Sequence, residues 1–97
     1  MANLSAARAK SAALSAATAD VITLGRNFRR VEVTNRSGDA EIWVRIGGTN
    51  PGVGGDDATC LPAAIGSVVI ESNERGNTVV RLISSGTPTY TVEGLEE

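Results

Sequence analysis

The sequence contains no histidine and only one cysteine, Cys60, among its 97 residues. Histidine is the commonest general base in enzymes and a frequent zinc ligand, so its absence removes the usual routes to acid–base catalysis and zinc binding. One cysteine cannot form an intramolecular disulfide or a multi-cysteine metal site. Because no histidine can activate it, we interpret Cys60 as a small buried core residue. We therefore expect no catalytic residue, no metal, no cofactor and no enzymatic activity.

Aromatic residues are also scarce, since Phe28, Trp43 and Tyr90 make up 3% of the chain. The length suits one domain, which buries about 60–65% of the surface of the unfolded chain when it folds. Its core must consist mainly of valine, isoleucine and leucine, each of which contributes about 1.5–3 kcal/mol when buried. Such a thin core favours association with a partner.

The chain has eight arginines but one lysine, and its formal net charge is −2 with a pI near 5.1. Domains that bind nucleic acid carry a basic surface, so we expect no nucleic-acid partner. No apolar run of about 20 residues is present, so we expect no transmembrane helix and no membrane partner. The N-terminus lacks the apolar core of about 7–15 residues that a secretory signal needs, so we expect folding in a reducing cytoplasm.

Residues 30–47 carry the clearest pattern, with two alternating runs on either side of a polar turn. Valine and isoleucine occupy every second position in these runs: Val31, Val33, Ile42, Val44 and Ile46. A period of two is typical of a half-buried strand. Residues 35–39 include Asn, Gly and Asp, which favour a tight turn. We predict an antiparallel β-hairpin whose strands cover residues 28–34 and 40–46.

Five further runs of β-prone residues are separated by turn signals. They cover residues 19–24, 58–61, 67–71, 78–83 and 89–93. In the last run we expect Tyr90 and Val92 to face inward. Together with the hairpin, these runs predict an all-β fold over residues 20–97, a small antiparallel β-sandwich or barrel of about six or seven strands.

Residues 1–19 form a region of different composition, since nine of them are alanine. Alanine has the highest helix propensity, and Asn3 could cap a helix over residues 4–16. Leu4 and Leu14 are its only large apolar residues, so such a helix would be marginal in isolation. We therefore expect this Ala-rich N-terminal arm to be either helical or extended. Two interpretations remain open for it: a flexible tail, or a segment that becomes ordered on a neighbouring subunit.

Residues 47–57 include five glycines and one proline, which predicts a long loop without regular structure. A P-loop would continue with lysine and then serine or threonine, whereas Asp56 and Asp57 follow Gly55 and would repel phosphate. Adjacent aspartates also lack the alternating spacing of an EF-hand. Three readings remain: a solvated connection, a calcium site that uses backbone carbonyls of the loop, or a surface loop that becomes ordered against a partner.

Trp43 is the most informative single residue, because it lies on the strand face opposite Ile42, Val44 and Ile46. If those three residues face the core, Trp43 points outward, and exposed tryptophans are enriched at protein interfaces. The alternative is that Trp43 packs within its own monomer, over a sheet edge or under the N-terminal segment. Our candidate interface residues are Leu4, Leu14, Trp43, Asn50, Pro51 and Val53.

Three stretches together resemble a known group of proteins: VEVTNR (residues 31–36), IWVRIGGTNP (42–51) and VVRLISSGTPTYTVEG (79–94). They resemble small β-rich virion structural proteins of tailed bacteriophages, especially those of actinobacterial hosts. The likeness covers residues 20–94 and consists of strand ends and loops, without a catalytic signature. It implies a capsid decoration or tail accessory protein with a role in assembly and stability.

The function that this resemblance implies is that of a capsid decoration protein, made in the host cytoplasm and located in the virion. Its partners would be the major capsid protein and copies of itself, as a homo-oligomer on the outside of the head. Burial of surface at these contacts would strengthen the shell against the packaged DNA. The alternatives are a tail or fibre-associated structural protein and a carbohydrate-binding module for host attachment.

Overall fold

The computed structural model describes residues 9–72 and 76–96, and these residues form β-strands and no helix. The strands are β1 (Ala9–Ala13), β2 (Asp20–Thr23), β3 (Arg30–Asn35), β4 (Ile42–Ile46), β5 (Thr59–Leu61), β6 (Gly66–Glu71), β7 (Val79–Ile83) and β8 (Thr89–Glu96). Within those ranges, no helix could span a membrane.

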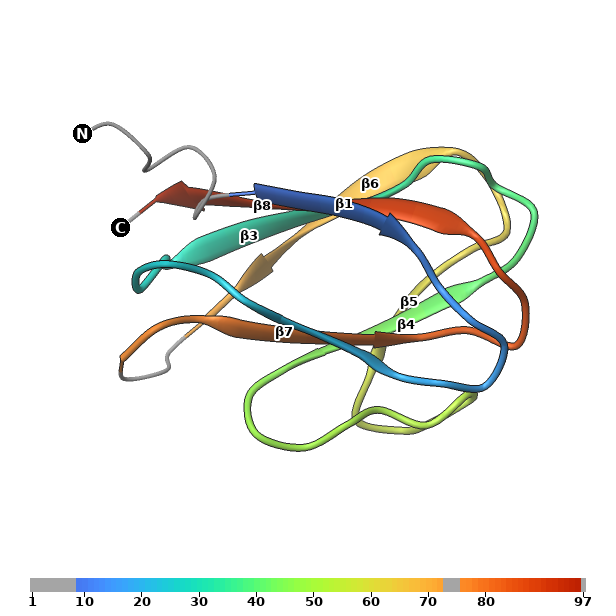
Figure 1. Cartoon of the computed structure of the whole chain (residues 1–97), viewed down its shortest axis with the longest axis horizontal. Coiled ribbons are helices and arrows are strands. Elements are labelled where there is room, and N and C mark those ends of the chain that lie inside the picture. Colours follow the sequence, from blue (N-terminus) through green and yellow to red (C-terminus); the bar gives the residue numbers. More distant parts are fainter. Residues whose placement is uncertain (1–8, 73–75, 97) are drawn as a thin grey trace.

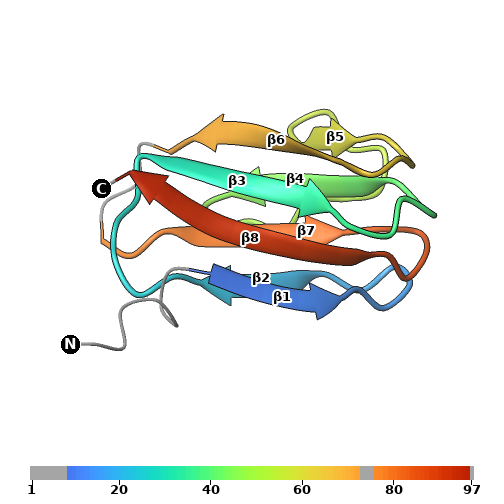
Figure 2. The ribbon, with the colours of Figure 1, turned by 90° about the horizontal axis from the view of Figure 1, so that it is seen from above.

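The strands form two four-stranded antiparallel sheets, which Figures 1 and 2 show as two stacked layers. Sheet I has the order β1-β8-β3-β6, and sheet II has the order β2-β7-β4-β5. The first strand therefore pairs with the last, the second with the seventh, the third with the sixth and the fourth with the fifth. This is the strand order of an eight-stranded jelly roll, a double-sheet sandwich. The predicted all-β class is confirmed, with the sandwich rather than the closed barrel.

The core lies between the two sheets and consists mainly of aliphatic side chains, as the composition predicted. Its buried members are Leu14, Leu24, Phe28, Val31, Val33, Ile42, Val44, Leu61, Val80, Leu82, Tyr90 and Val92. In β3, β4, β7 and β8 these residues occupy alternate positions, because successive side chains leave opposite faces of a strand. The inward orientation predicted for Tyr90 and Val92 is confirmed, since both are fully buried.

The predicted hairpin over residues 30–47 is wrong, because β3 and β4 lie in different sheets. β3 pairs with β6 and β8 in sheet I, whereas β4 pairs with β5 and β7 in sheet II. The connection between them is an arch that crosses the end of the sandwich. A period of two shows that one face of each strand is buried, and this holds equally when two strands face each other across a core.

The side chain of Asn35 holds this arch and a second one together. Its Nδ2 donates to the carbonyl oxygen of Ala40 at 2.9 Å and to that of Pro62 at 3.1 Å, while its Oδ1 accepts from the Gly38 amide at 3.0 Å. Ala40 belongs to the β3–β4 arch and Pro62 to the β5–β6 arch. Asn35 is fully buried, so these contacts satisfy an amide that water cannot reach.

Because Gly38 has no side chain, the same two arches can approach each other closely at this point. The φ of Gly38 is +70°, and a Cβ at this position would lie 2.7 Å from the backbone nitrogen of Ile65. Both the backbone angle and the close approach therefore favour glycine here.

Of the helical and extended forms that we considered for the N-terminal arm, the structure shows the extended form in the part that it describes. Residues 9–13 form β1, which pairs with β8, and Ser11 Oγ lies 2.8 Å from Thr91 Oγ1. Leu14 follows and is 2% exposed within the core. The hydrogen bonds to β8 and the burial of Leu14 outweigh the helix propensity of alanine, which is weak in isolation.

We predicted that the β-domain begins at residue 20. Because β1 belongs to sheet I, the sandwich begins earlier in the sequence. Residues 9–14 belong to the β-domain rather than to a separate arm. The prediction of an arm for residues 1–8 falls outside the described residues, as does Leu4.

At the opposite end of the sandwich, Phe28 packs between β8 and the start of β7. Its backbone nitrogen donates to Thr78 Oγ1 at 2.8 Å, and that hydroxyl donates to the carbonyl oxygen of Phe28 at 3.2 Å. The ring of Phe28 lies over Gly94, where a Cβ would be within 2.6 Å of three ring carbons. Glycine at position 94 therefore makes room for the aromatic ring.

We predict that Asn35→Asp lowers the free energy of unfolding by about 3 kcal/mol or more. The carboxylate cannot donate to the two carbonyl groups and places a buried charge beside them. Urea denaturation at neutral pH measures the change, and Asn77→Asp at an exposed position serves as the control. Equal midpoints for the two variants would show that the Asn35 amide does not hold the arches.

We predict that Gly94→Ala lowers the free energy of unfolding by about 1–3 kcal/mol, because the added methyl group displaces the Phe28 ring. The matched control is Gly48→Ala, where a Cβ meets no atom within 4 Å. That variant should keep or slightly raise the stability. A loss of the same size in both variants would contradict the packing of Phe28 on Gly94.

Candidate interaction surface

The outer face of sheet II carries a row of three side chains that crosses its strands. Trp43 of β4 is the register partner of Cys60 on β5 and of Ile83 on β7. Trp43 and Ile83 are half-buried, and Cys60 is exposed. Trp43 therefore lies on the face opposite Ile42 and Val44, which are buried, as we predicted from the alternation.

Cys60 does not belong to the core, which corrects our prediction. Leu61 takes the inward position of β5, so its neighbour Cys60 must point outward. The Cys60 Sγ lies 3.9 Å from Glu41 Oε2. Loss of solvent around the thiol, followed by the nearby Glu41 carboxylate, raises the pKa of Cys60 above its usual value. The thiol is therefore poorly ionised at neutral pH and a weak nucleophile.

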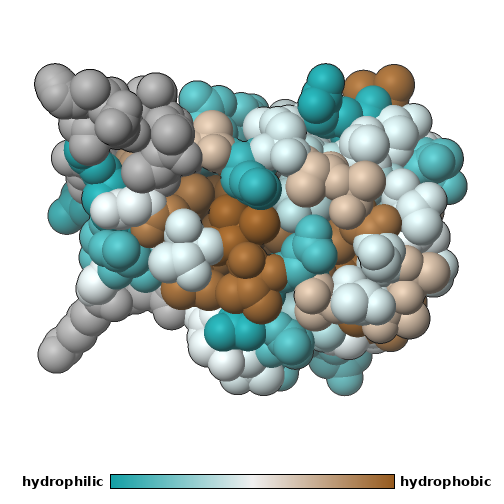
Figure 3. All heavy atoms as spheres, in the orientation of Figure 1, coloured by the Kyte–Doolittle hydropathy of each residue, from teal (hydrophilic) through white to brown (hydrophobic). Residues whose placement is uncertain are grey.

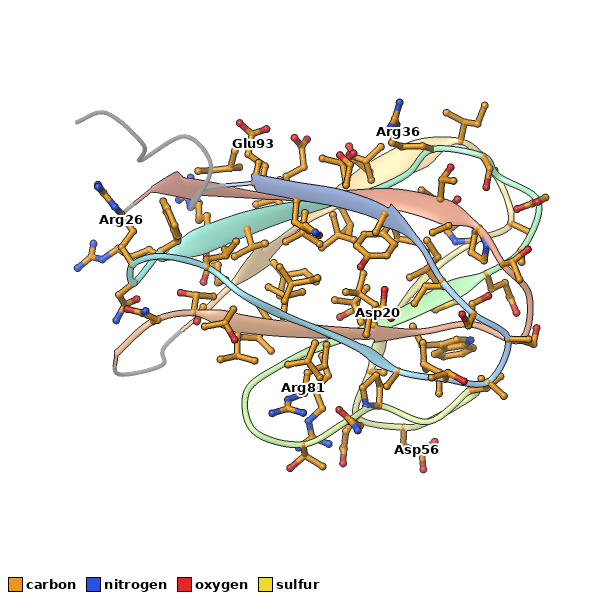
Figure 4. All side chains as sticks on the ribbon, viewed as in Figure 1. Asp20, Arg26, Arg36, Asp56, Arg81 and Glu93 are labelled. Atoms are coloured by element: carbon orange, nitrogen blue, oxygen red, sulfur yellow. The ribbon has the colours of Figure 1, made fainter. Side chains whose placement is uncertain are left out.

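Two arginines on the same face hold the 47–57 loop against sheet II. Arg81 donates from Nε to the carbonyl oxygen of Gly47 at 2.6 Å and from Nη1 to Asn50 Oδ1 at 2.7 Å. Arg45, its register partner on β4, forms an ion pair with Asp57 of 3.6 Å between Nη1 and Oδ2. The two cations thus bind opposite ends of the loop, and Figure 4 shows Arg81 directed toward it.

The loop itself has no regular structure, as predicted, although all of residues 47–58 are described. Pro51 is buried, and the Gly55 amide donates to the Gly52 carbonyl oxygen at 2.9 Å, which closes a tight turn. Gly54 adopts a φ of +76° within this turn. Val53 lies at the tip, where 48% of it is exposed. The loop is therefore held at its base and presents an apolar residue at its tip.

A small polar hollow of about 130 Å³ lies between the loop and the sheet. Its lining consists of Arg45, Asn50, Pro51, Gly52, Gly55, Asp56, Asp57 and Ala58. Among residues 9–72 and 76–96, no group of three His, Cys, Asp or Glu side chains is placed to hold a metal ion. A calcium site built from backbone carbonyls needs no such group of side chains, so it stays a prediction.

A second surface lies where β1 and β2 form one side of the sandwich. Figure 3 shows hydrophobic side chains gathered between these two strands. Tyr90 Oη reaches from sheet I and donates to Asp20 Oδ2 of sheet II at 2.7 Å (Figure 4). Burial, and then this hydrogen bond to the carboxylate, raise the pKa of Tyr90 well above its usual range. The phenol therefore stays protonated and links the two sheets at this edge.

The structure brings together only some of the six candidate residues. Asn50, Pro51 and Val53 share the loop, and Trp43 lies on the same outer face of sheet II. Leu14 is in the core and is not available for a contact with a neighbour. The sequence interpretation missed Arg45 and Arg81, although alternation places Arg45 on the face of Trp43.

No protein-family model, no curated protein and no solved structure matches this chain.

We predict that Arg81→Met loosens the 47–57 loop without unfolding the sandwich. The variant keeps an apolar stem but removes both hydrogen bonds to the loop, so amide protection there should fall about tenfold, which corresponds to about 1.4 kcal/mol. Hydrogen exchange followed by mass spectrometry measures this change, with Arg36→Met in a different loop as the control. Unchanged protection in the Arg81 variant would contradict the anchoring.

Proposed function

We propose that this protein is a structural protein of a bacteriophage virion, a capsid decoration protein that binds the outside of the head. In this role it contacts the major capsid protein and neighbouring copies of itself. The buried contacts tie capsid subunits together, which raises the pressure and temperature that the shell withstands. The function is physical and involves no chemical step.

Two general arguments support the proposal. The sequence resembles small β-rich virion proteins over residues 20–94. The jelly roll is also an architecture of viral capsid domains, although fold alone does not determine function, so this second argument is an analogy.

The observation that carries the proposal is the anchored loop on sheet II. Two hydrogen bonds from Arg81 hold the first part of the loop, and an ion pair between Arg45 and Asp57 adds to them at its end, so less conformational entropy is lost when the loop binds a partner. Its tip presents Val53, and Trp43 lies on the same face of the sheet. An anchored loop with an apolar tip, on the same side of the sheet as a half-buried tryptophan, is typical of a protein contact.

The polar hollow beside the loop favours a second candidate, a carbohydrate-binding module for host attachment. Guanidinium, carboxylate and amide groups line it, and these groups form hydrogen bonds with sugar hydroxyls. Jelly rolls also include lectins. A protein of this kind would bind isolated host cell-wall polysaccharide, and Arg45→Met would abolish that binding.

We predict that the protein cosediments with expanded heads of the phage that encodes it and raises their disruption temperature. Val53→Asp should weaken head binding about tenfold or more, because it places a charge in a desolvated contact. Leu95→Asp, at an exposed position on β8, should bind like the wild type. Binding to purified tails alone would support the tail-associated alternative, and binding to neither would remove the virion proposal.

A further inference from the structure

The two sheets end in four edge strands, β1 and β6 in sheet I and β2 and β5 in sheet II. Exposed edges pair readily with other strands, and natural proteins usually protect them with short length, proline or charge. β1 carries Lys10, β2 has four residues and begins with Asp20, and β5 has three residues followed by Pro62. β6 has six residues without proline or lysine, and its one charge is the terminal Glu71.

The register of β6 with β3 determines which backbone groups face outward. The Ser72 amide donates to the Arg29 carbonyl oxygen at 2.8 Å, so position 72 faces β3. In an antiparallel ladder the hydrogen-bonding direction alternates. Residues 70, 68 and 66 therefore also bond to β3, and residues 67, 69 and 71 direct their N–H and C=O groups to the free edge.

This arrangement is self-complementary about a two-fold axis at Val69. An antiparallel pair centred there joins Val69 to Val69 of a second copy, and it joins Ser67 to Glu71 in both directions. These three residue pairs exchange two hydrogen bonds each, six in all, which satisfies every outward group of residues 67, 69 and 71. By contrast, an axis at Val68 would pair residue 67 of each copy with residue 69 of the other, and within the strand it would form only four hydrogen bonds.

The side chains also match in this register. Val69 is 50% exposed and would pack against its own copy, which favours pairing of β-branched residues. Glu71 would lie opposite a serine rather than another carboxylate, and its own neighbour on β3 is Arg30. No like charges face each other across the seam, whereas an axis that paired Glu71 with Glu71 would oppose two carboxylates.

An apolar hollow of about 260 Å³ opens along the same side of the sandwich. Its lining includes Leu61 of β5, and Pro62, Ala64 and the 75% exposed Ile65 of the β5–β6 arch. A second copy at this edge would cover part of this apolar surface, which adds hydrophobic stabilisation to the backbone hydrogen bonds.

We propose that β6 pairs with β6 of a second copy of this chain, centred on Val69. The two copies of sheet I then form one continuous eight-stranded antiparallel sheet across a C2 interface. This interface uses β6 of sheet I, whereas the 47–57 loop is held by Arg45 and Arg81 of sheet II. The dimer does not depend on the proposed virion function.

The first experiment measures the mass of the full chain by sedimentation equilibrium over a range of concentrations. Wild-type protein should reach twice the 10.0 kDa of one chain. Val69→Lys should remain monomeric, because lysine on an edge opposes strand pairing. The matched control is Val21→Lys on β2, an equally exposed edge valine at 47%, which should dimerise like the wild type. Thermal unfolding of each variant verifies that it is folded.

The second experiment tests the register with a disulfide in a Cys60→Ser background. Paired residues in a hydrogen-bonded antiparallel pair have Cα atoms about 5.5 Å apart, within the range of about 4.4–6.8 Å that a disulfide spans. Val69→Cys should therefore crosslink into a dimer under mild oxidation, and Val21→Cys should not.

Two results would overturn the proposal: a wild type that stays monomeric at every concentration, and equal behaviour of the two lysine variants. If the wild type is monomeric and Val69→Lys loses head binding, β6 pairs with a capsid strand instead of a second copy. If the protein forms the dimer but does not bind heads, only the proposed virion function is excluded.

Discussion

The buried amide of Asn35 sets the geometry on which the rest of the sandwich depends. Its two N–H groups hold carbonyl oxygens that belong to two different arches, one leading into β4 and one leaving β5. A single side chain of sheet I thus positions two strands of sheet II. Among the described residues, no buried side-chain polar atom lacks a hydrogen-bond partner. A fully satisfied polar group in a core of aliphatic side chains favours this arrangement of the sheets, because an arrangement that separates the two arches removes partners of the amide.

Much of this fold could be predicted from the sequence, because the alternation of side chains is a local property of a strand. The runs of valine, isoleucine and leucine gave β2 to β8 and the inward positions of Tyr90 and Val92. The choice of partner strand is not local. Alternation in β3 and β4 is the same for a hairpin and for an arch. We assigned Asn35 to the hairpin turn, whereas it is the last residue of β3, and no local pattern reveals its contact with Pro62, 27 residues away.

The errors at β1 and Cys60 have different physical causes. β1 consists of alanine, serine and lysine, so neither size nor branching marks an inward face, and intrinsic propensity favoured a helix that tertiary pairing overrides. For Cys60 the signal existed, because an inward Leu61 requires an outward neighbour. The candidate surface could likewise be predicted only in part. Alternation predicts that Trp43 and Arg45 point outward. The contact between Arg81 and the Gly47 carbonyl oxygen depends on the path of the loop, which the residue pattern does not reveal.

The pairing of β8 with β1 has a consequence for how the molecule is made. Ser11 and Thr91 meet across 80 residues, and β8 lies between β1 and β3 in sheet I. During synthesis β1 has no partner in the described sheet I until β8 leaves the ribosome, and the sheet cannot close before then. Contacts between such distant residues slow folding. A growing chain therefore exposes the edges of β1 and β3 together, and their protection depends on completion of the final strand.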